Sequence, residues 1–133
     1  MTAIITLLGR ISLAAIFILS GISKIGSHDS TVAYMQAHGI PAAPFFLYAA
    51  VLIEIAGGFC VASGFRARLG SLLLVAFLIP TTYIFHFKPS FDAQMNMIDK
   101  NQMINVLKNL SIMGGLLLIY GNGAGKFTLG KDS

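Results

Sequence analysis

The sequence predicts an all-α fold, an integral membrane four-helix bundle that forms a single domain over residues 1–133. Three observations lead to this prediction. Hydrophobic residues make up 56% of the chain and charged residues only 11%, whereas a soluble domain carries about 25% charged residues. Four apolar runs are each long enough to cross a bilayer, and short polar segments connect them. Lipid, rather than water, is therefore expected to cover most of the surface.

Each apolar run is expected to form one helix, since about 20 residues rising roughly 1.5 Å each span a hydrocarbon core of about 30 Å. We expect these helices at about 4–23, 44–63, 69–87 and 103–120. The connection at 64–68 is so short that the second and third helices should be antiparallel neighbours. An even number of crossings places both termini on the same side of the membrane.

Two other interpretations of the apolar runs are less favourable. Arg10 lies inside the first run and no cleavage pattern of small residues follows it, so a cleavable signal peptide is not expected. Helices that lie on the membrane surface need a charged face, and each run contains at most one charged residue. The runs are therefore interpreted as membrane-spanning helices.

The basic residues indicate orientation rather than nucleic-acid binding. The net charge of +4 comes from nine basic residues that are spread singly between the apolar runs, with no stripe that could follow a phosphate backbone. One side of the membrane would receive Arg66, Arg68, Lys126 and Lys131, and the other Lys24, Lys88 and Lys100. Because cytoplasmic segments carry the excess of Lys and Arg, both termini are expected in the cytoplasm.

No sequence motif indicates a metal, a haem or a nucleotide. The histidines, His28, His38 and His86, come from different segments and lack a second ligand three or four residues away. The lone cysteine, Cys60, can form no internal disulfide. The Gly-rich segment 121–126 lacks the strand and the Ser or Thr of a phosphate-binding loop, and it is interpreted as part of a flexible tail.

Three charged residues at membrane depth are the first candidates for a functional site. A charge at a helix centre costs about 2.5 to 3.5 kcal/mol on insertion scales, so Arg10, Glu54 and Lys108 are expected to face the bundle interior and to find partners. Counting about 1.5 Å per residue places Glu54 between the two cations, about 15 Å below the outer boundary. Glu54 could then pair with Arg10, with Lys108 or with both. Such a network either fixes how the helices assemble or forms a ligand and proton site, and the sequence leaves both interpretations open.

A second group of polar residues is expected near the outer boundary. His86 ends the third run after Pro80, which should kink that helix, and its depth is similar to that of Lys24, Lys108 and Asn109. These four side chains are candidates for a head-group site, with interfacial packing as the alternative explanation for His86. On the fourth helix, a polar and small stripe should pack against other helices or line a pocket; it consists of Asn101, Asn105, Lys108, Ser111 and Gly115.

Short segments distributed over nearly the whole chain form a recognisable set. They are Gly9-Arg10, Ser20-Gly21-Ile22-Ser23-Lys24-Ile25, His38-Gly39-Ile40-Pro41, Ile53-Glu54-Ile55-Ala56-Gly57-Gly58, Gly64-Phe65-Arg66-Ala67-Arg68, Pro80-Thr81-Thr82, Phe85-His86-Phe87, Lys108-Asn109-Leu110 and Gly114-Gly115-Leu116-Leu117. Taken together, this set resembles the DoxX family. The resemblance implies a bacterial inner-membrane protein of four helices, in a family named after the membrane subunit of a thiosulfate:quinone oxidoreductase.

Two functions from different classes remain open on this basis. In the first, the chain is a quinone-reactive or redox-associated membrane subunit that acts with a redox enzyme or forms a homo-oligomer. The quinone would then be held by Arg10, Lys24, Glu54, His86, Lys108 and Asn109, while a partner enzyme would supply the electrons. In the second, the chain is a non-catalytic scaffold or a small transporter subunit that holds a partner through the Arg66–Arg68 loop or the tail.

Overall fold

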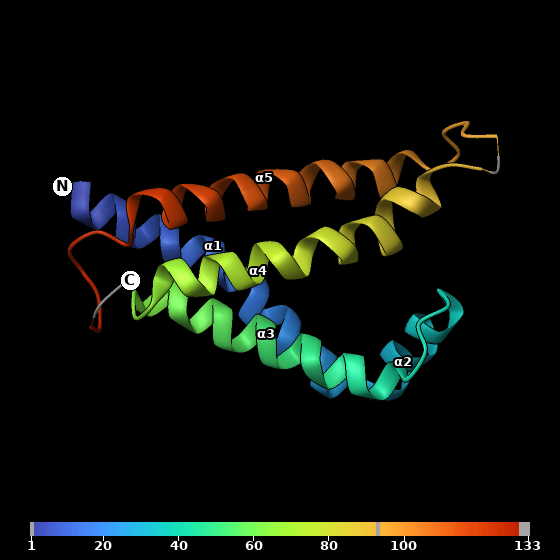
Figure 1. The fold of residues 1–133 in the computed structure, drawn as a ribbon, viewed down its shortest axis with the longest axis horizontal. Coiled ribbons are helices and arrows are strands. Elements are labelled where there is room, and N and C mark those ends of the chain that lie inside the picture. The colour runs from blue at the N-terminus through green and yellow to red at the C-terminus, as the bar shows by residue number, and fades with distance from the viewer. Residues whose placement is uncertain (1, 93, 131–133) are drawn as a thin grey trace.

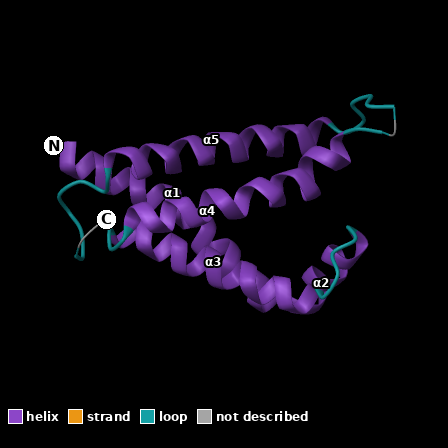
Figure 2. Ribbon diagram, in the orientation of Figure 1, coloured by secondary structure: helices purple, strands orange, loops and turns teal. Residues whose placement is uncertain are grey.

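Helices account for most of the residues that the structure describes. The computed structural model describes residues 2–92 and 94–130, and its elements are α1 (Thr2–Gly26), α2 (His28–Ala37), α3 (Ala43–Ser63), α4 (Ala67–Thr82), the π-helix η1 (Tyr83–Phe87), the 3-10 helix η2 (Lys88–Ser90) and α5 (Lys100–Asn122). These described residues contain no β-strand, only an isolated bridge between Phe91 and Met97. Figure 2 shows this helical content. The all-α fold predicted from the sequence is confirmed.

Four of the helical segments are long and apolar enough to cross a membrane. They are Thr2–Gly26, Ala43–Ser63, Ala67–Ser90, in which η1 and η2 continue α4, and Lys100–Asn122. The four predicted helices are therefore present, and the first, third and last are several residues longer than predicted. The molecule is an all-α membrane helical bundle.

The helices form two pairs that meet at one end of the bundle and separate toward the other (Figure 1). Along the bundle, α1 packs against α3, α3 against α4 and α4 against α5, whereas α1 and α5 make little contact. We call the end that holds Thr2, the 64–66 turn and the tail 123–130 the closed end. The end that holds α2 and residues 91–92 and 94–99 is the open end. The main hydrophobic core consists of Ala14, Phe17, Val61, Leu74, Leu78 and Leu116.

Glycines let α3 pack closely against both of its neighbours. A Cβ atom added to Gly57 would lie 2.8 Å from the side chain of Leu74 on α4, and one added to Gly58 would lie 2.8 Å from the side chain of Ile18 on α1. Small residues at such positions allow the backbones of membrane helices to approach. Glu54, one turn earlier on α3, is thereby held between α1 and α4 and is buried.

The short helix α2 lies in a segment that the sequence analysis treated as a connection. Its buried residue Met35 packs with Ala43 and Leu47 of α3 in a second, smaller core. This contact explains why a stretch with little helical hydrophobic pattern is ordered at the open end, because tertiary packing overrides weak local preference.

Pro80 lies inside α4, and the helix widens just after it. A proline removes one backbone donor, and the next residue, Thr81, donates a hydrogen bond from its hydroxyl to the carbonyl oxygen of Phe77 at 2.8 Å. The π-helix η1 then carries Phe85 toward α2 and His86 toward α5. Wide turns of this kind are frequent at functional sites.

The tail is folded as far as residue 130, so the prediction of a flexible tail was wrong for this part. The backbone N–H of Leu129 donates to the carbonyl oxygen of Ser63 at 2.8 Å, and the guanidinium of Arg10 donates to the carbonyl oxygen of Phe127. Gly123 and Ala124 are buried. The tail therefore covers the closed end; Lys131, which contributed to the predicted orientation, lies outside the described residues.

Candidate functional site

A cleft of about 650 Å³ lies between the two helix pairs at the open end of the bundle. One wall comes from α2 and α3, with Met35, Leu47 and Ile53, and the other from α4 and η1, with Phe77 and Ile84. Most of the lining is apolar, and a few polar side chains contribute to it: Lys24, Thr31, Tyr34, His38, Thr81, Tyr83, His86 and Lys88. An apolar cleft with a few polar groups is the usual form of a small-molecule site.

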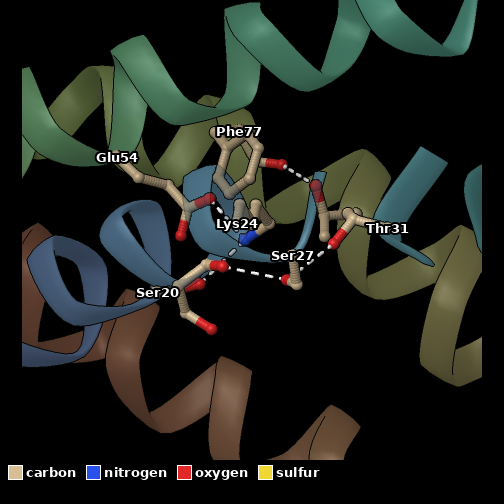
Figure 3. Close-up of polar contacts among 8 residues, drawn as sticks. Ser20, Lys24, Ser27, Thr31, Glu54 and Phe77 are labelled. Carbon is tan, nitrogen blue, oxygen red and sulfur yellow. Dashed lines mark hydrogen bonds and ion pairs between the residues drawn. The ribbon is translucent and has the colours of Figure 1, made fainter. Parts of the chain in front are cut away.

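Lys24 and the buried Glu54 form a partly buried ion pair beside this cleft (Figure 3). The ammonium Nζ of Lys24 lies 2.6 Å from Oε1 of Glu54 and donates a second hydrogen bond to Oγ of Ser20 at 2.8 Å. The side chain of Glu54 is 3% exposed and that of Lys24 is 27% exposed. An ammonium has three donors, so Lys24 can present a third N–H to a molecule in the cleft.

The expectation that Glu54 pairs with Arg10 or Lys108 was wrong. Arg10 is buried at the closed end, where it contacts the tail, and Lys108 is exposed on α5. Lys24 reaches Glu54 because helical side chains lean toward the N-terminus of their own helix, which carries the ammonium from the last turn of α1 back toward the middle of α3. Ser20 lies four residues before Lys24, on the path of that side chain.

Three aromatic rings connect the two walls of the cleft. The ring of Phe85 on η1 stacks on Tyr34 with 5.3 Å between centroids and lies 4.9 Å from the ring of His38. Tyr34 and His38, four residues apart, are themselves 4.4 Å apart. This contact was not predicted from the sequence, in which the spacing of Tyr34 and His38 is the only signal for it. We call these three residues the aromatic bridge.

His86 lines the cleft and is oriented from α5. Its Nδ1 lies 2.7 Å from Oε1 of Gln102, whose amide oxygen also accepts a hydrogen bond from Nδ2 of Asn105 at 3.3 Å. Because an amide oxygen only accepts, Nδ1 carries the proton in this pair and Nε2 remains for another contact. Gln102 is a positioning residue that the sequence analysis did not single out.

The structure separates the six predicted site residues. Lys24 and His86 line the cleft. Glu54 does not line it but forms the ion pair with Lys24 beside it. Asn109 instead donates to Oγ1 of Thr82 at 2.9 Å and joins α5 to α4, while Arg10 and Lys108 lie elsewhere. The predicted stripe on α5 is divided as well, since Asn105 and Gly115 are partly buried whereas Asn101, Lys108 and Ser111 are exposed. In residues 2–92 and 94–130, no group of three His, Cys, Asp or Glu side chains is placed to hold a metal ion.

Four long apolar helices define a multi-pass integral membrane protein. The sequence profile of the DoxX family matches residues 5–87, and this chain belongs to that family. It is 31% identical over 125 residues to Inner membrane protein YqjF of Escherichia coli (strain K12), covering 94% of this chain and 88% of that protein. It is also 31% identical over 128 residues to Inner membrane protein YphA of the same organism, covering 96% of this chain and 89% of that protein. No solved structure matches.

These comparisons agree with the predicted family and with the predicted location in the bacterial inner membrane. The chain is a multi-pass inner-membrane protein of the DoxX family. The family match ends at Phe87, whereas α5 and the tail lie beyond it.

Proposed function

We propose that this protein is a quinone-binding membrane subunit, and that the cleft between α3 and α4 is its quinone site. The observation that carries the proposal is the combination of an apolar cleft of about 650 Å³ with the ammonium of Lys24 in its lining. Isoprenoid quinones have an apolar tail and a head group with two carbonyl oxygens. The apolar walls fit the tail, and the remaining N–H of Lys24 fits a carbonyl oxygen.

In this proposal, three side chains hold the head group and its protons. Lys24 donates a hydrogen bond to one carbonyl oxygen, and Glu54 and Ser20 fix the direction of the ammonium. His86, held by Gln102 through Nδ1, offers Nε2 to the same cleft. Positioned donors and acceptors of this kind support proton exchange with a bound molecule. When bound, the quinone would carry two electrons and two protons, the electrons coming from a partner redox enzyme.

The test is retention of quinone through purification. The wild-type protein and its variants are extracted in a mild detergent, and ubiquinone and menaquinone are quantified by chromatography of the extracted lipids. We expect near-stoichiometric quinone on the wild-type protein, and a loss of about ten- to 150-fold in Lys24→Met, because one charge-assisted hydrogen bond is worth about 1.5 to 3 kcal/mol. Glu54→Gln keeps the shape of the side chain and should weaken retention less.

A matched pair of alanine variants separates the cleft from the rest of the surface. Ala50 lines the cleft, and Ala76 is exposed on α4. Ala50→Leu should fill the cleft and lower quinone retention, whereas Ala76→Leu should leave it unchanged. A folded Lys24→Met or Ala50→Leu protein that still carries wild-type quinone would contradict the proposal.

A scaffold function is the second candidate, and exposed charge at the closed end favours it. Arg66, Arg68 and Lys126 are exposed there, and such residues could hold an acidic partner. Replacing all three with Gln should leave quinone retention unchanged. Loss of membrane redox activity in that variant, with no quinone found on the wild-type protein, would support the scaffold instead.

We also propose that both termini lie in the cytoplasm. The closed end holds both described ends of the chain together with the exposed basic residues Arg66, Arg68 and Lys126, whereas the exposed basic residues at the open end are Lys88 and Lys100. An excess of Lys and Arg is typical of cytoplasmic segments.

A further inference from the structure

Lys108 differs from the other charged residues that lie well inside the long helices. Arg10 is 1% exposed and Glu54 is 3% exposed, and both contact other parts of the chain. Lys108, in contrast, is exposed on α5, and within the part of the chain that the structure describes no hydrogen bond or ion pair reaches its ammonium. It lies eight residues after Lys100, the first residue of α5, which corresponds to a depth of about 12 Å along the helix.

We propose that the exposed face of α5 is an intramembrane interface for a helix of another protein, and that this helix carries a carboxylate that pairs with Lys108. An unpaired ammonium facing hydrocarbon is unfavourable, and ionisable residues in membrane segments normally face protein or one another. A carboxylate is the side chain that compensates an ammonium. The partner is therefore defined by its chemistry, an acidic residue at the depth of Lys108.

The surface around Lys108 is suited to close helix contact. Ser111 lies one turn further along and is exposed, and its hydroxyl donates a hydrogen bond to the carbonyl oxygen of Leu107. Gly114, three residues after Ser111, is also exposed, and an added Cβ there would meet no atom within 4 Å. Small residues with nothing against them permit a second backbone to approach. Of the four membrane-spanning segments, α5 also has the smallest fraction of buried residues, 11% of an apolar 18-residue stretch.

A second copy of this chain cannot supply the carboxylate. The chain contains five acidic residues, and among the described ones only Glu54 lies at membrane depth, where it is buried and paired with Lys24. Asp29, Asp92 and Asp99 lie outside the long helices, and Asp132 follows α5 in the sequence. A symmetric dimer through α5 would bring two Lys108 side chains together, which is repulsive. The partner is therefore a different protein.

The principal competing arrangement is snorkelling of Lys108 toward the membrane surface. Because side chains lean toward the N-terminus of their helix, the ammonium of Lys108 can reach toward the Lys100 end and contact water or lipid phosphate. Snorkelling predicts no preference for an acidic helix, so an experiment with defined helices distinguishes the two.

The experiment measures association with synthetic membrane-spanning peptides in phosphatidylcholine vesicles, where no anionic lipid is present. Two Leu-Ala peptides are compared by energy transfer to labelled protein, one with a single Glu at the depth of Lys108 and one with Gln there. We expect the Glu peptide to bind wild-type protein about five- to thirty-fold more tightly than the Gln peptide, the range measured for polar contacts between model membrane helices. Lys108→Gln should remove this preference, and Lys100→Gln should keep it as the matched control.

A charge exchange tests the pair directly. The Lys108→Glu variant should no longer bind the Glu peptide, and it should bind the same peptide with Lys in place of Glu. Since Lys108 is exposed, these variants should melt at the wild-type temperature in detergent, which separates loss of binding from loss of fold. Equal binding of the Glu and Gln peptides overturns the proposal. So does self-association of the wild-type protein that depends on Lys108.

Discussion

Lys24 and Glu54 are unequal members of their ion pair. Glu54 is almost fully buried and has Lys24 as its partner, whereas Lys24 also has Ser20 and is partly exposed at the cleft. Removing one member of a buried pair leaves the other charge without compensation, and this penalty grows with burial. The stability of the fold should therefore depend more on the presence of Lys24 than on the charge of Glu54.

This asymmetry leads to a double-mutant prediction. Lys24→Met should lower the free energy of unfolding by about 3 to 5 kcal/mol, because it leaves the buried carboxylate of Glu54 unpaired. Glu54→Gln should cost only about 1 to 2 kcal/mol, since the amide oxygen can still accept from Lys24. In the double variant the two losses should be less than additive. Denaturation of the purified proteins in mixed detergent micelles measures all three, and strict additivity would show that the two side chains do not interact.

At the scale of the helices, small residues determine how closely neighbouring helices pack. The side chain of Leu74 occupies the space beside Gly57, so a larger residue there must push α3 away from α4. Gly57→Leu should therefore lower stability by about 1 to 3 kcal/mol, the usual cost of overpacking. Gly9→Leu is the matched control on α1, because nothing lies within 4 Å of an added Cβ at Gly9. Thermal unfolding in detergent compares the melting temperatures of the two variants. Equal melting temperatures would mean that α3 and α4 do not need close contact.

The elements that the sequence predicts well are those whose environment is decided locally. Each long apolar run must form a helix in lipid, because backbone groups have no other partner there, and the four helices follow from this rule alone. The ion pair of Lys24 and Glu54 depends instead on the direction in which a long side chain leans, which counting residues by depth does not include. Likewise, the ordered tail depends on Leu129 meeting Ser63, a contact between residues far apart in the chain.

The candidate site was predicted in part for the same reason. Polar residues within apolar runs or at their ends stand out in the sequence, so Lys24, Glu54 and His86 were identified as candidates and all three lie in or beside the cleft. Which of the remaining polar residues share the site depends on helix rotation. Because α5 turns Asn109 toward α4 and leaves Lys108 exposed, these two residues do not line the cleft.

For the whole molecule, the orientation in the membrane determines which compartment the cleft opens toward. The cleft lies toward the end that holds α2, Asp29 and Asp99, and the opposite end holds the 64–66 turn and Lys126. If the basic end is cytoplasmic, as charge asymmetry favours, a quinone head group in the cleft would lie nearer the periplasmic surface. Proton exchange through His86 would then occur with that side.

Reporter fusions test this orientation. A reporter that is active only in the cytoplasm, fused after Ala67 or after Thr128, should show full activity, because both positions lie at the closed end. The same reporter after Asp29 or Asn96 should be inactive, and a periplasm-specific phosphatase should show the reverse pattern at all four sites. Since positive charge is the stated cause, Arg66→Glu together with Arg68→Glu should reduce the bias toward a cytoplasmic closed end. Cytoplasmic activity at Asp29 and Asn96 in the unaltered chain would instead place the cleft on the cytoplasmic side and reverse the proposed direction of proton exchange.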